Sequence, residues 1–187
     1  MLTAVTGINW GDEGKGRVID MLAEKADIIV RYQGGNNAGH TVVSEQGKFV
    51  LNLLPSGILH PEAVCILGDG MVVDPEHLSR EIAQIREKGI EVTPKNLKIS
   101  KRATISMPWH RIQDELEESR LEKTGSAFGS TRRGIAYAYS DKYRKKTLRM
   151  GDLLHLNEEN THSRLKMMLE AKNLELAGCY YQEPMSY

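Results

Sequence analysis

The sequence predicts an α/β fold with a largely parallel sheet, flanking helices and a P-loop-like turn after the first strand. Short apolar runs that are typical of buried strands alternate with longer segments of helical periodicity. Two of these runs lead directly into glycine-rich turns, within residues 8–17 and 31–41. Strands, glycine-rich turns and helices in alternation indicate a parallel sheet that is covered by helices.

The chain begins with an apolar run, LTAVTGI over residues 2–8, that predicts a buried strand. Residues 15–24 predict a helix with its apolar side chains on one face, and residues 26–32 predict a second strand. Residues 41–54 predict a hairpin whose polar turn lies near residues 45–47. We therefore expect a strand, a helix, a strand and a hairpin in that order.

Two more short strands are predicted after the hairpin. The run AVCIL, residues 63–67, predicts a buried strand that ends at the tight sequence Gly-Asp-Gly at 68–70. The run LKIS, residues 97–100, predicts another strand. Between them, residues 74–89 carry helix signals, because an Asp-Pro pair suits a helix start and the final glycine suits a helix end.

The second half of the chain predicts two helices and a long loop. A helix over residues 109–121 would place Ile112 and Leu116 on its buried side. Residues 123–143 are rich in Gly, Ser, Thr and Arg without periodicity, which predicts a loop. Structureless loops of this size are usually functional or disordered. Residues 158–176 predict the last helix.

Composition excludes several classes of function. The 187 residues include 25 basic and 25 acidic side chains, so no overall charge favours nucleic acid or a membrane surface. Cys65 and Cys179 are too few for a disulfide framework. No apolar run is long enough to cross a bilayer and no signal peptide is visible, so we expect a cytoplasmic protein.

The stretch INWGDEGKGR, residues 8–17, predicts a phosphate-binding loop. Gly11, Gly14 and Gly16 allow the backbone to approach an anion, and Lys15 supplies a positive charge. The usual Ser or Thr after the lysine is absent, because Gly16 stands there. The alternative interpretation is a tight strand-to-helix turn with Asp12 as the helix cap.

Asp12 and Glu13 give this loop a negative charge that phosphates would repel. Asp12 is compatible with phosphate binding if it ligates the accompanying metal, or if it takes a proton from a second substrate. Mg²⁺ prefers oxygen ligands and usually arrives together with phosphates. A carboxylate is therefore a sensible replacement for the missing hydroxyl ligand.

The stretch RYQGGNNAGHT, residues 31–41, follows the second predicted strand. Its glycines free the backbone, Asn36 and Asn37 offer amides, and His40 lies near the end. Such a loop can contact a phosphate, a base edge or a metal, and the alternative is a plain turn with a solvated histidine. Loops after neighbouring parallel strands share the sheet edge where open α/β sheets bind ligands. We therefore expect both glycine-rich loops at one site.

The stretch GINWGDEGKGRVIDMLAEKADIIVRYQGGNNAGHTVV resembles the N-terminus of adenylosuccinate synthetases. The segments LLPSGILH, GDGMVVDP, GSTRRGIAYAYSDKY and RMGDLL are also similar to segments of that family. The resemblance implies an enzyme that joins IMP and L-aspartate to form adenylosuccinate, with GTP as co-substrate and Mg²⁺ as cofactor. It also implies a homodimer, with no nucleic acid or membrane as a partner.

The resemblance implies a role for individual residues. Asp12 matches the base that takes the N1 proton of IMP and also ligates Mg²⁺, together with the Gly39 carbonyl. His40 matches the acid that meets charge on the departing GTP phosphate, and Lys15 holds the transferred phosphoryl group. The implied GTP contacts are Gly11, Asp12, Glu13, Gly14, Lys15, Gly16, Arg17, Gly39, His40 and Thr41. The implied IMP contacts are Asp12, Glu13, Gly14, Lys15, Asn37, Ala38, Gly39, His40, Thr131 and Lys145.

The chain departs from the family pattern in three places. Tyr137 stands where the family has a proline. Lys145 stands at the arginine that crosses the dimer to IMP, and the adjacent Arg144 is the alternative for that role. Family members are more than twice as long, so we expect residues 1–187 to be an N-terminal portion without the guanine and aspartate determinants.

The sequence leaves two alternatives to ligation open. One is a truncated nucleotide-binding remnant that lacks ligase activity, which the missing determinants favour. The other is an unrelated P-loop NTPase, against which the absent hydroxyl after Lys15 and the second glycine-rich loop both count.

Overall fold

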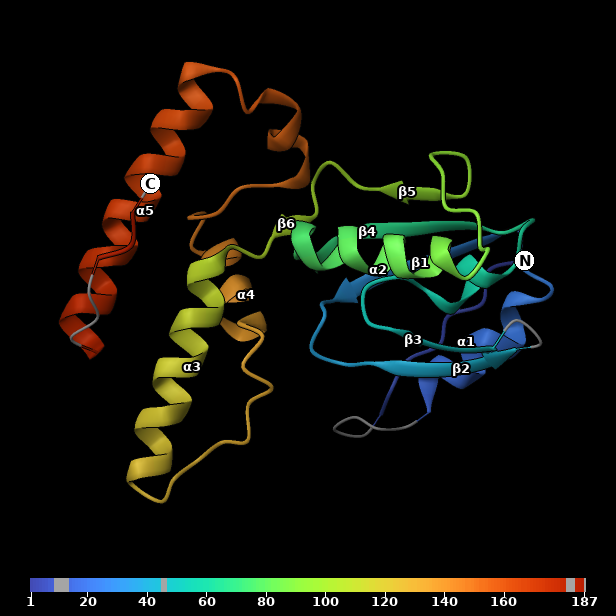
Figure 1. Cartoon of the computed structure of the whole chain (residues 1–187), viewed down its shortest axis with the longest axis horizontal. Coiled ribbons are helices and arrows are strands. Elements are labelled where there is room, and N and C mark those ends of the chain that lie inside the picture. Colours follow the sequence, from blue (N-terminus) through green and yellow to red (C-terminus); the bar gives the residue numbers. More distant parts are fainter. Residues whose placement is uncertain (9–13, 45–46, 181–183, 187) are drawn as a thin grey trace.

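A computed structural model describes residues 1–8, 14–44, 47–180 and 184–186. In chain order its elements are α1 (Lys15–Ala23), β1 (Ile28–Gly34), β2 (His40–Ser44), β3 (Gly47–Leu51), η1 (Ser56–Leu59), β4 (Val64–Val73), α2 (Pro75–Glu87), β5 (Leu97–Ile99), β6 (Thr104–Ile105), α3 (Pro108–Lys123), α4 (Ile135–Tyr143), η2 (Met150–His155) and α5 (Glu159–Tyr180). Figure 1 shows the sheet, the hairpin, α1 and α2 in one half of the molecule, and α3, α4 and α5 in the other.

The main sheet is parallel, as the sequence predicts. Strand β4 is central, with β1 and β5 on either side, and β6 pairs with the end of β4. Ile28 of β1 lies opposite Val64 of β4, and all three pairings run parallel. The α/β fold class with flanking helices is therefore confirmed.

The predicted hairpin forms a separate two-stranded sheet. Strands β2 and β3 are antiparallel, and His40 at the start of β2 pairs with Leu51 at the end of β3. The middle of the predicted turn, residues 45–46, lies outside the described residues. The pairing fixes His40 beside the chain that leaves β3.

The hydrophobic core lies where the sheet, the hairpin, α1, α2 and η1 meet. Its fully buried members include Leu51, Leu53, Leu54, Leu67 and Met71. Burying one such side chain contributes about 1.5–3 kcal/mol relative to leaving it in water. Helix α2 begins where predicted, because the Asp74 carboxylate accepts a 2.9 Å hydrogen bond from the His77 N–H.

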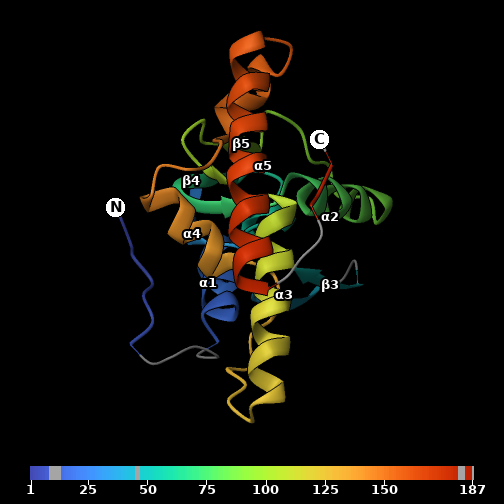
Figure 2. The same cartoon turned by 90° about the vertical axis from the view of Figure 1, so that its left-hand side faces the viewer.

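Figure 2 turns the helical half toward the viewer and shows α5 as a long helix in front of α3 and α4. Helix α5 has 22 residues and packs on α3. The sequence correctly predicts α5, but α3 buries a different face from the one predicted. Ile112 and Leu116 are only half buried, whereas the residues that α3 buries are Trp109, His110, Gln113, Asp114 and Glu118. The reason is that α3 faces polar partners on α5 and in the following loop.

The predicted strand over residues 2–8 is wrong. The segment has no strand conformation, and Leu2 and Ile8 are 95% and 93% exposed. A strand must pair its backbone N–H and C=O groups with a neighbour. Residues 2–8 form no strand, and in the part of the chain that the structure describes β1 forms its ladder with β4.

Strand β4 does not end at residues 68–70, so that predicted turn is also wrong. The strand continues to Val73, and its pairing with β1 shifts register near Gln33. A Cβ built at Gly70 would lie 2.2 Å from the Tyr32 carbonyl oxygen. The glycine therefore permits a close approach of two strands and does not mark a chain reversal.

The predicted loop over residues 123–143 is wrong in its second half, where α4 forms. The helix is preceded by Gly134, which has a φ of 73° and gives no side-chain cap. A Cβ there would lie 2.4 Å from the His110 carbonyl carbon. The start of α4 is set by this close packing on α3, which periodicity does not reveal.

Candidate functional site

The N-terminus of α1 faces the start of β2. Gly14, with a φ of 70°, precedes the helix, and Lys15 and Arg17 are exposed in its first turn. The free N–H groups and the dipole of a helix N-terminus attract anions. A Cβ built at Gly16 would lie 2.7 Å from the Cβ of His40. The structure thus brings the two glycine-rich segments into contact at this point.

His40 is half buried at this contact. Its Nε2 is buried and has no hydrogen-bond partner in the part of the chain that the structure describes. Burial lowers the pKa of His40, and the nearby Arg31 guanidinium lowers it further. The imidazole is therefore neutral at physiological pH, with a ring nitrogen left for a ligand.

Arg31 fastens the loop after β1 to the chain after β3. Its Nη2 donates a 2.8 Å hydrogen bond to the Gly35 carbonyl, and its Nη1 donates to the carbonyls of Asn52 and Leu53. Burial lowers the pKa of Arg31, although the Glu81 carboxylate opposes that shift. The guanidinium keeps its charge because its ordinary pKa is far above neutrality.

In the loop after β1, Asn36 is buried, whereas the residues that follow it are exposed. Asn36 is 4% exposed, and its Nδ2 lies 3.4 Å from Asp74 Oδ2. The residues exposed to solvent are Asn37, Ala38, Gly39 and Thr41. A Cβ at Gly39 would lie 2.9 Å from the Asn52 side-chain amide nitrogen, so a larger residue there would displace the Asn52 side chain.

A polar hollow of about 300 Å³ lies beside Asn52. It is lined by Val50, Asn52, His77, Arg80, Glu81, Gln84 and Arg133. Two guanidinium groups among these residues suit an anionic ligand, because arginine binds carboxylates and phosphates through paired donors.

Thr131 is exposed in a loop that α3 holds in place. Asp114 accepts hydrogen bonds from the Ser130 hydroxyl at 2.6 Å and from the Gly134 N–H at 2.8 Å. Glu118 accepts a 3.2 Å hydrogen bond from the Ser130 N–H. Both carboxylates are buried, so their bonds to the loop are protected from water.

Helix α4 connects this loop to the loop after β1. The Tyr139 hydroxyl donates to the Gly70 carbonyl and accepts from the Gly34 N–H, both at 2.8 Å. A Cβ at Gly35 would lie 2.5 Å from Cδ1 of Ile135. The segment that carries Thr131 is thus in contact, through α4, with the loop that leads from β1 to His40.

Lys145 is not part of this contact region within one chain. It lies beyond the C-terminal end of α4, a nine-residue helix that is roughly 13.5 Å long at 1.5 Å per residue. Arg144 is paired with Asp141 at 3.4 Å and with Glu175 at 3.6 Å. Within the described residues Lys145 has no ion pair, so it is the more available of the two cations.

Gly11, Asp12 and Glu13 lie outside the described residues, so their predicted roles have no geometry here. The described residues contain no group of three His, Cys, Asp or Glu side chains that can hold a metal. Mg²⁺ bound with a nucleotide needs only one or two carboxylates, because phosphate oxygens and water complete its shell. Asp12 has a carboxylate and Gly39, an exposed residue, has a carbonyl oxygen, and these are ligand types that such a site uses.

Several supporting residues were missed by the sequence interpretation. Asp114 and Glu118 hold the loop of Thr131 and lie in none of the predicted motifs, whereas Arg31 is the first residue of the stretch 31–41 but had no predicted role. Asp114 and Glu118 are spaced by four residues on α3, and this spacing puts both on one helical face. An acidic pair on a helix usually marks a surface that is exposed to water. The spacing therefore suggested exposed side chains, whereas Asp114 and Glu118 are buried.

The fold and these contacts define an α/β protein in which an exposed helix N-terminus, of the kind that attracts anions, lies beside a half-buried histidine at the start of β2. The family model described as adenylosuccinate synthetase matches residues 4–187. The chain therefore belongs to the adenylosuccinate synthetase family.

Curated relatives and solved structures agree with this assignment. The adenylosuccinate synthetase of Halothermothrix orenii is 50% identical over 181 residues, which cover 97% of this chain and 41% of that protein. The adenylosuccinate synthetase of Caldanaerobacter subterraneus is 45% identical over 186 residues, which cover 100% of this chain and 42% of that protein. The chain thus spans less than half the length of these relatives.

Two solved structures share the fold. Fully ligated adenylosuccinate synthetase from Plasmodium falciparum matches with a TM-score of 0.77 and 37% identity, over 90% of this chain and 39% of that one. The succinoaminodeoxyadenylate synthetase of cyanophage S-2L, bound to dGMP and dATP, matches with a TM-score of 0.58 and 26% identity. This match covers 86% of this chain and 45% of that one.

Proposed function

We propose that this chain carries the phosphate-binding and IMP-binding portion of an enzyme that joins IMP and L-aspartate with GTP. Membership of the family supports the reaction, and the contact between Gly16 and His40 is the observation that carries the site. The chain spans 41% of the Halothermothrix orenii relative, so the ligase activity itself is a proposal. We treat residues 1–187 as one N-terminal portion of the family's catalytic domain.

The proposed reaction has two displacements. Asp12 takes the N1 proton of IMP, and the 6-oxygen then attacks the γ-phosphorus of GTP, so that GDP leaves. The amine of L-aspartate next attacks C6 of the phosphorylated IMP, and phosphate departs to leave adenylosuccinate. General-base help of this kind contributes about 10²–10⁴-fold.

Lys15 and the helix N-terminus would hold the transferred phosphoryl group by charge and by position. Mg²⁺, held by Asp12 and the Gly39 carbonyl, would neutralise negative charge on the phosphates. His40 is neutral in the free chain because burial lowers its pKa. An anionic phosphate beside the free Nε2 would raise that pKa, so nucleotide binding itself can supply the proton that the acid role requires.

Thr131 would contact the IMP phosphate from the loop that α3 holds, with Asn37 and Ala38 near the base. Lys145 would reach the IMP of a neighbouring subunit in a homodimer, which fits its position beyond the far end of α4. None of the helices in the described residues is both long and apolar enough to cross a membrane. We place the reaction in the cytoplasm, with no nucleic-acid partner.

The test is adenylosuccinate formation by the 187-residue chain with IMP, L-aspartate and Mg-GTP. We expect the Asp12→Asn variant to lose at least 100-fold in rate, since it lacks the base, while its circular dichroism spectrum is unchanged. Equal rates in the two proteins would contradict the role of Asp12. Loss of folding in the variant would favour the helix-cap interpretation.

A second candidate is a nucleotide-binding chain without ligase activity. The limited coverage of the relatives favours it, because the chain matches 39% of the ligated Plasmodium falciparum structure. Calorimetric titration with Mg-GTP and with IMP distinguishes the two candidates. Binding without any product supports this second function, whereas binding with product supports the ligase.

A further inference from the structure

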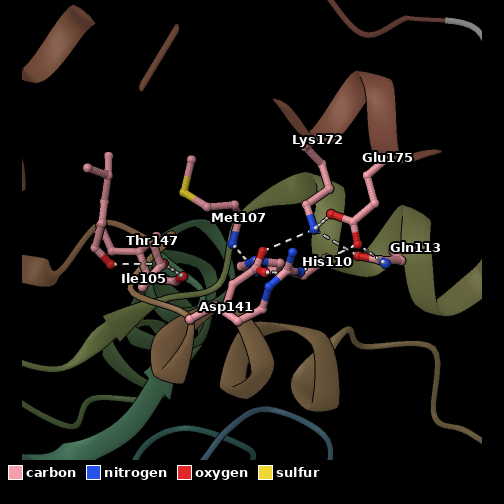
Figure 3. Close-up of polar contacts among 10 residues, drawn as sticks. Ile105, Met107, His110, Gln113, Asp141, Thr147, Lys172 and Glu175 are labelled. Carbon is pink, nitrogen blue, oxygen red and sulfur yellow. Dashed lines mark hydrogen bonds and ion pairs between the residues drawn. The ribbon is translucent and has the colours of Figure 1, made fainter. Parts of the chain in front are cut away.

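A cluster of charged and polar side chains joins α3, α4 and α5 away from the site described above (Figure 3). Its members are His110, Gln113, Asp141, Lys172 and Glu175. Lysine is almost never buried unless it is paired, and Lys172 is only 6% exposed. Its Nζ lies 3.1 Å from Asp141 Oδ2, 3.1 Å from Gln113 Oε1 and 3.0 Å from Glu175 Oε2. Three oxygen atoms therefore surround this ammonium group.

Asp141 on α4 is the hub of the cluster. Besides Lys172, its Oδ2 accepts a 3.2 Å hydrogen bond from Nε2 of His110. The Met107 N–H donates to Nδ1 of His110 at 3.0 Å, so Nδ1 is unprotonated and Nε2 carries the hydrogen. The carboxylate thus takes one donor from α3 and another from α5, and both donors are buried.

The backbone of Asp141 closes the turn that follows α4. Its carbonyl accepts a 2.8 Å hydrogen bond from the Lys146 N–H, and its Oδ1 lies 3.4 Å from Nη1 of Arg144. Between them, Lys145 has a φ of 60°, a left-handed conformation that is strained for a residue with a Cβ. Such strain persists when the surroundings over-determine it. The hub residue is bonded to both neighbours of the strained lysine.

We propose that Lys172 and Asp141 are positioning residues, which hold the basic turn 144–146 so that Lys145 presents its ammonium group to a phosphorylated ligand. Lys172 balances the carboxylates of Asp141 and Glu175 together with Arg144. Without Lys172 the two carboxylates would repel each other, and Arg144 would be drawn away from the turn to compensate. The identity of the ligand as IMP rests on the proposed function, whereas the positioning itself does not.

The positioning is tested by amide hydrogen exchange of the 187-residue chain, measured by NMR. We expect Lys172→Met to raise the exchange rate of the Lys146 amide at least tenfold, because the bond to the Asp141 carbonyl opens more often. Lys172→Arg should keep the rate within about threefold of the original, since it retains the positive charge. The control is Lys166→Met, an exposed lysine on the same helix, which should change nothing.

Each outcome decides the matter. Faster exchange at Lys146 in Lys172→Met, with the amides of α2 unchanged, supports the positioning role. An unchanged Lys146 rate overturns it. A rise at Lys146 and in α2 alike also overturns it, because the cluster would then only stabilise the fold as a whole.

Titration with IMP tests the ligand. We expect Lys172→Met to weaken IMP binding about tenfold. Lys172→Arg should weaken it less, and Lys166→Met should bind IMP as the original chain does. A loosened turn with undiminished IMP affinity would overturn the link to the ligand. If the original chain binds no IMP while the Lys146 amide still responds, the proposed function fails and the positioning role stands.

Discussion

His40 and His110 both have lowered pKa values, but their surroundings serve different purposes. His40 keeps a buried ring nitrogen without a partner in the described part of the chain, next to the N-terminus of α1. His110 has both ring nitrogens engaged, one by the Met107 N–H and the other by Asp141. An imidazole with an open nitrogen can serve a ligand, whereas one with both engaged serves the fold.

The buried His110 predicts a pH-dependent stability. Burial lowers the pKa of His110 below its ordinary value of about 6.5, although the Asp141 bond opposes that shift. As the pH falls below about 6.5 the unfolded chain takes up the proton first, so the free energy of unfolding falls until the folded pKa is reached. Well above pH 6.5 the imidazole of His110 is neutral in both the folded and the unfolded chain, so its contribution to the pH dependence vanishes.

Urea unfolding between pH 5 and pH 7.5 checks this prediction. We expect His110→Gln to reduce the slope of the free energy of unfolding between pH 5 and 6.5 by up to about 1.4 kcal/mol per pH unit. Bonds from His110 and Lys172 hold the pKa of Asp141 below its ordinary value despite burial, so its own titration lies below this window. If the free energy of unfolding has the same slope against pH in both proteins, the pKa of His110 is not lowered in the folded chain.

At the residue scale the sequence predicted which side chains to consider but not how they are held. Gly16 and His40 could be predicted because glycine-rich loops with polar side chains carry a recognisable pattern. Asp114 and Asp141 could not, because a buried carboxylate has no local signature. Its environment depends on donors that other elements supply, and those donors are set by packing.

Among the elements, α2 does more than cover the sheet. Glu81 on α2 is 4% exposed and accepts hydrogen bonds from three consecutive backbone N–H groups after β3. The shortest of these bonds is 2.7 Å, from the Asn52 N–H. The carboxylate therefore fixes the chain that also meets Arg31 and Gly39.

Glu81→Gln should destabilise the chain by about 2–3 kcal/mol. The amide presents a donor where the carboxylate presents an acceptor, so at least one buried N–H loses its partner. Chemical denaturation monitored by circular dichroism measures the change. The exposed Glu87→Gln on the same helix is the control and should shift stability by less than about 0.5 kcal/mol. A change in stability for Glu81→Gln that matches the control would contradict the role of Glu81 in holding the backbone of residues 52–54.

Elements with strong local signals were predicted well, and those that depend on neighbours were not. Helix α2 has a capping aspartate, a proline in its first turn and a terminal glycine with a φ of 84°, and its bounds agree with the prediction. Helix α4 has no side-chain cap, and its start depends on the close packing of Gly134 against α3. Residues 2–8 have the composition of a strand but form none in the structure.

On the scale of the whole molecule, the sheet half carries the contact between Gly16 and His40, and the helical half carries the loop of Thr131 and the turn of Lys145 (Figure 1). Helix α4 links the halves, because Tyr139 bonds to Gly34 and Gly70 in the sheet. This division explains why candidate residues far apart in the sequence belong to one arrangement.

We infer that the N-terminus of α1 and His40 together form a phosphate site. Gly16→Ala tests it, because the added Cβ would lie 2.7 Å from Cβ of His40 and must move the histidine or the helix end. Alanine otherwise favours a helix by up to about 1 kcal/mol over glycine, so the substitution does not weaken α1 by itself. The matched control is Gly178→Ala in α5, where a Cβ meets nothing within 4 Å.

Calorimetric titration of the chain with Mg-GTP measures phosphate binding at this site most directly. We expect Gly16→Ala to weaken binding at least tenfold, which is about 1.4 kcal/mol, and Gly178→Ala to bind as the original chain does. Undiminished binding by Gly16→Ala, or no binding by the original chain, would contradict the claim that this contact forms a phosphate site.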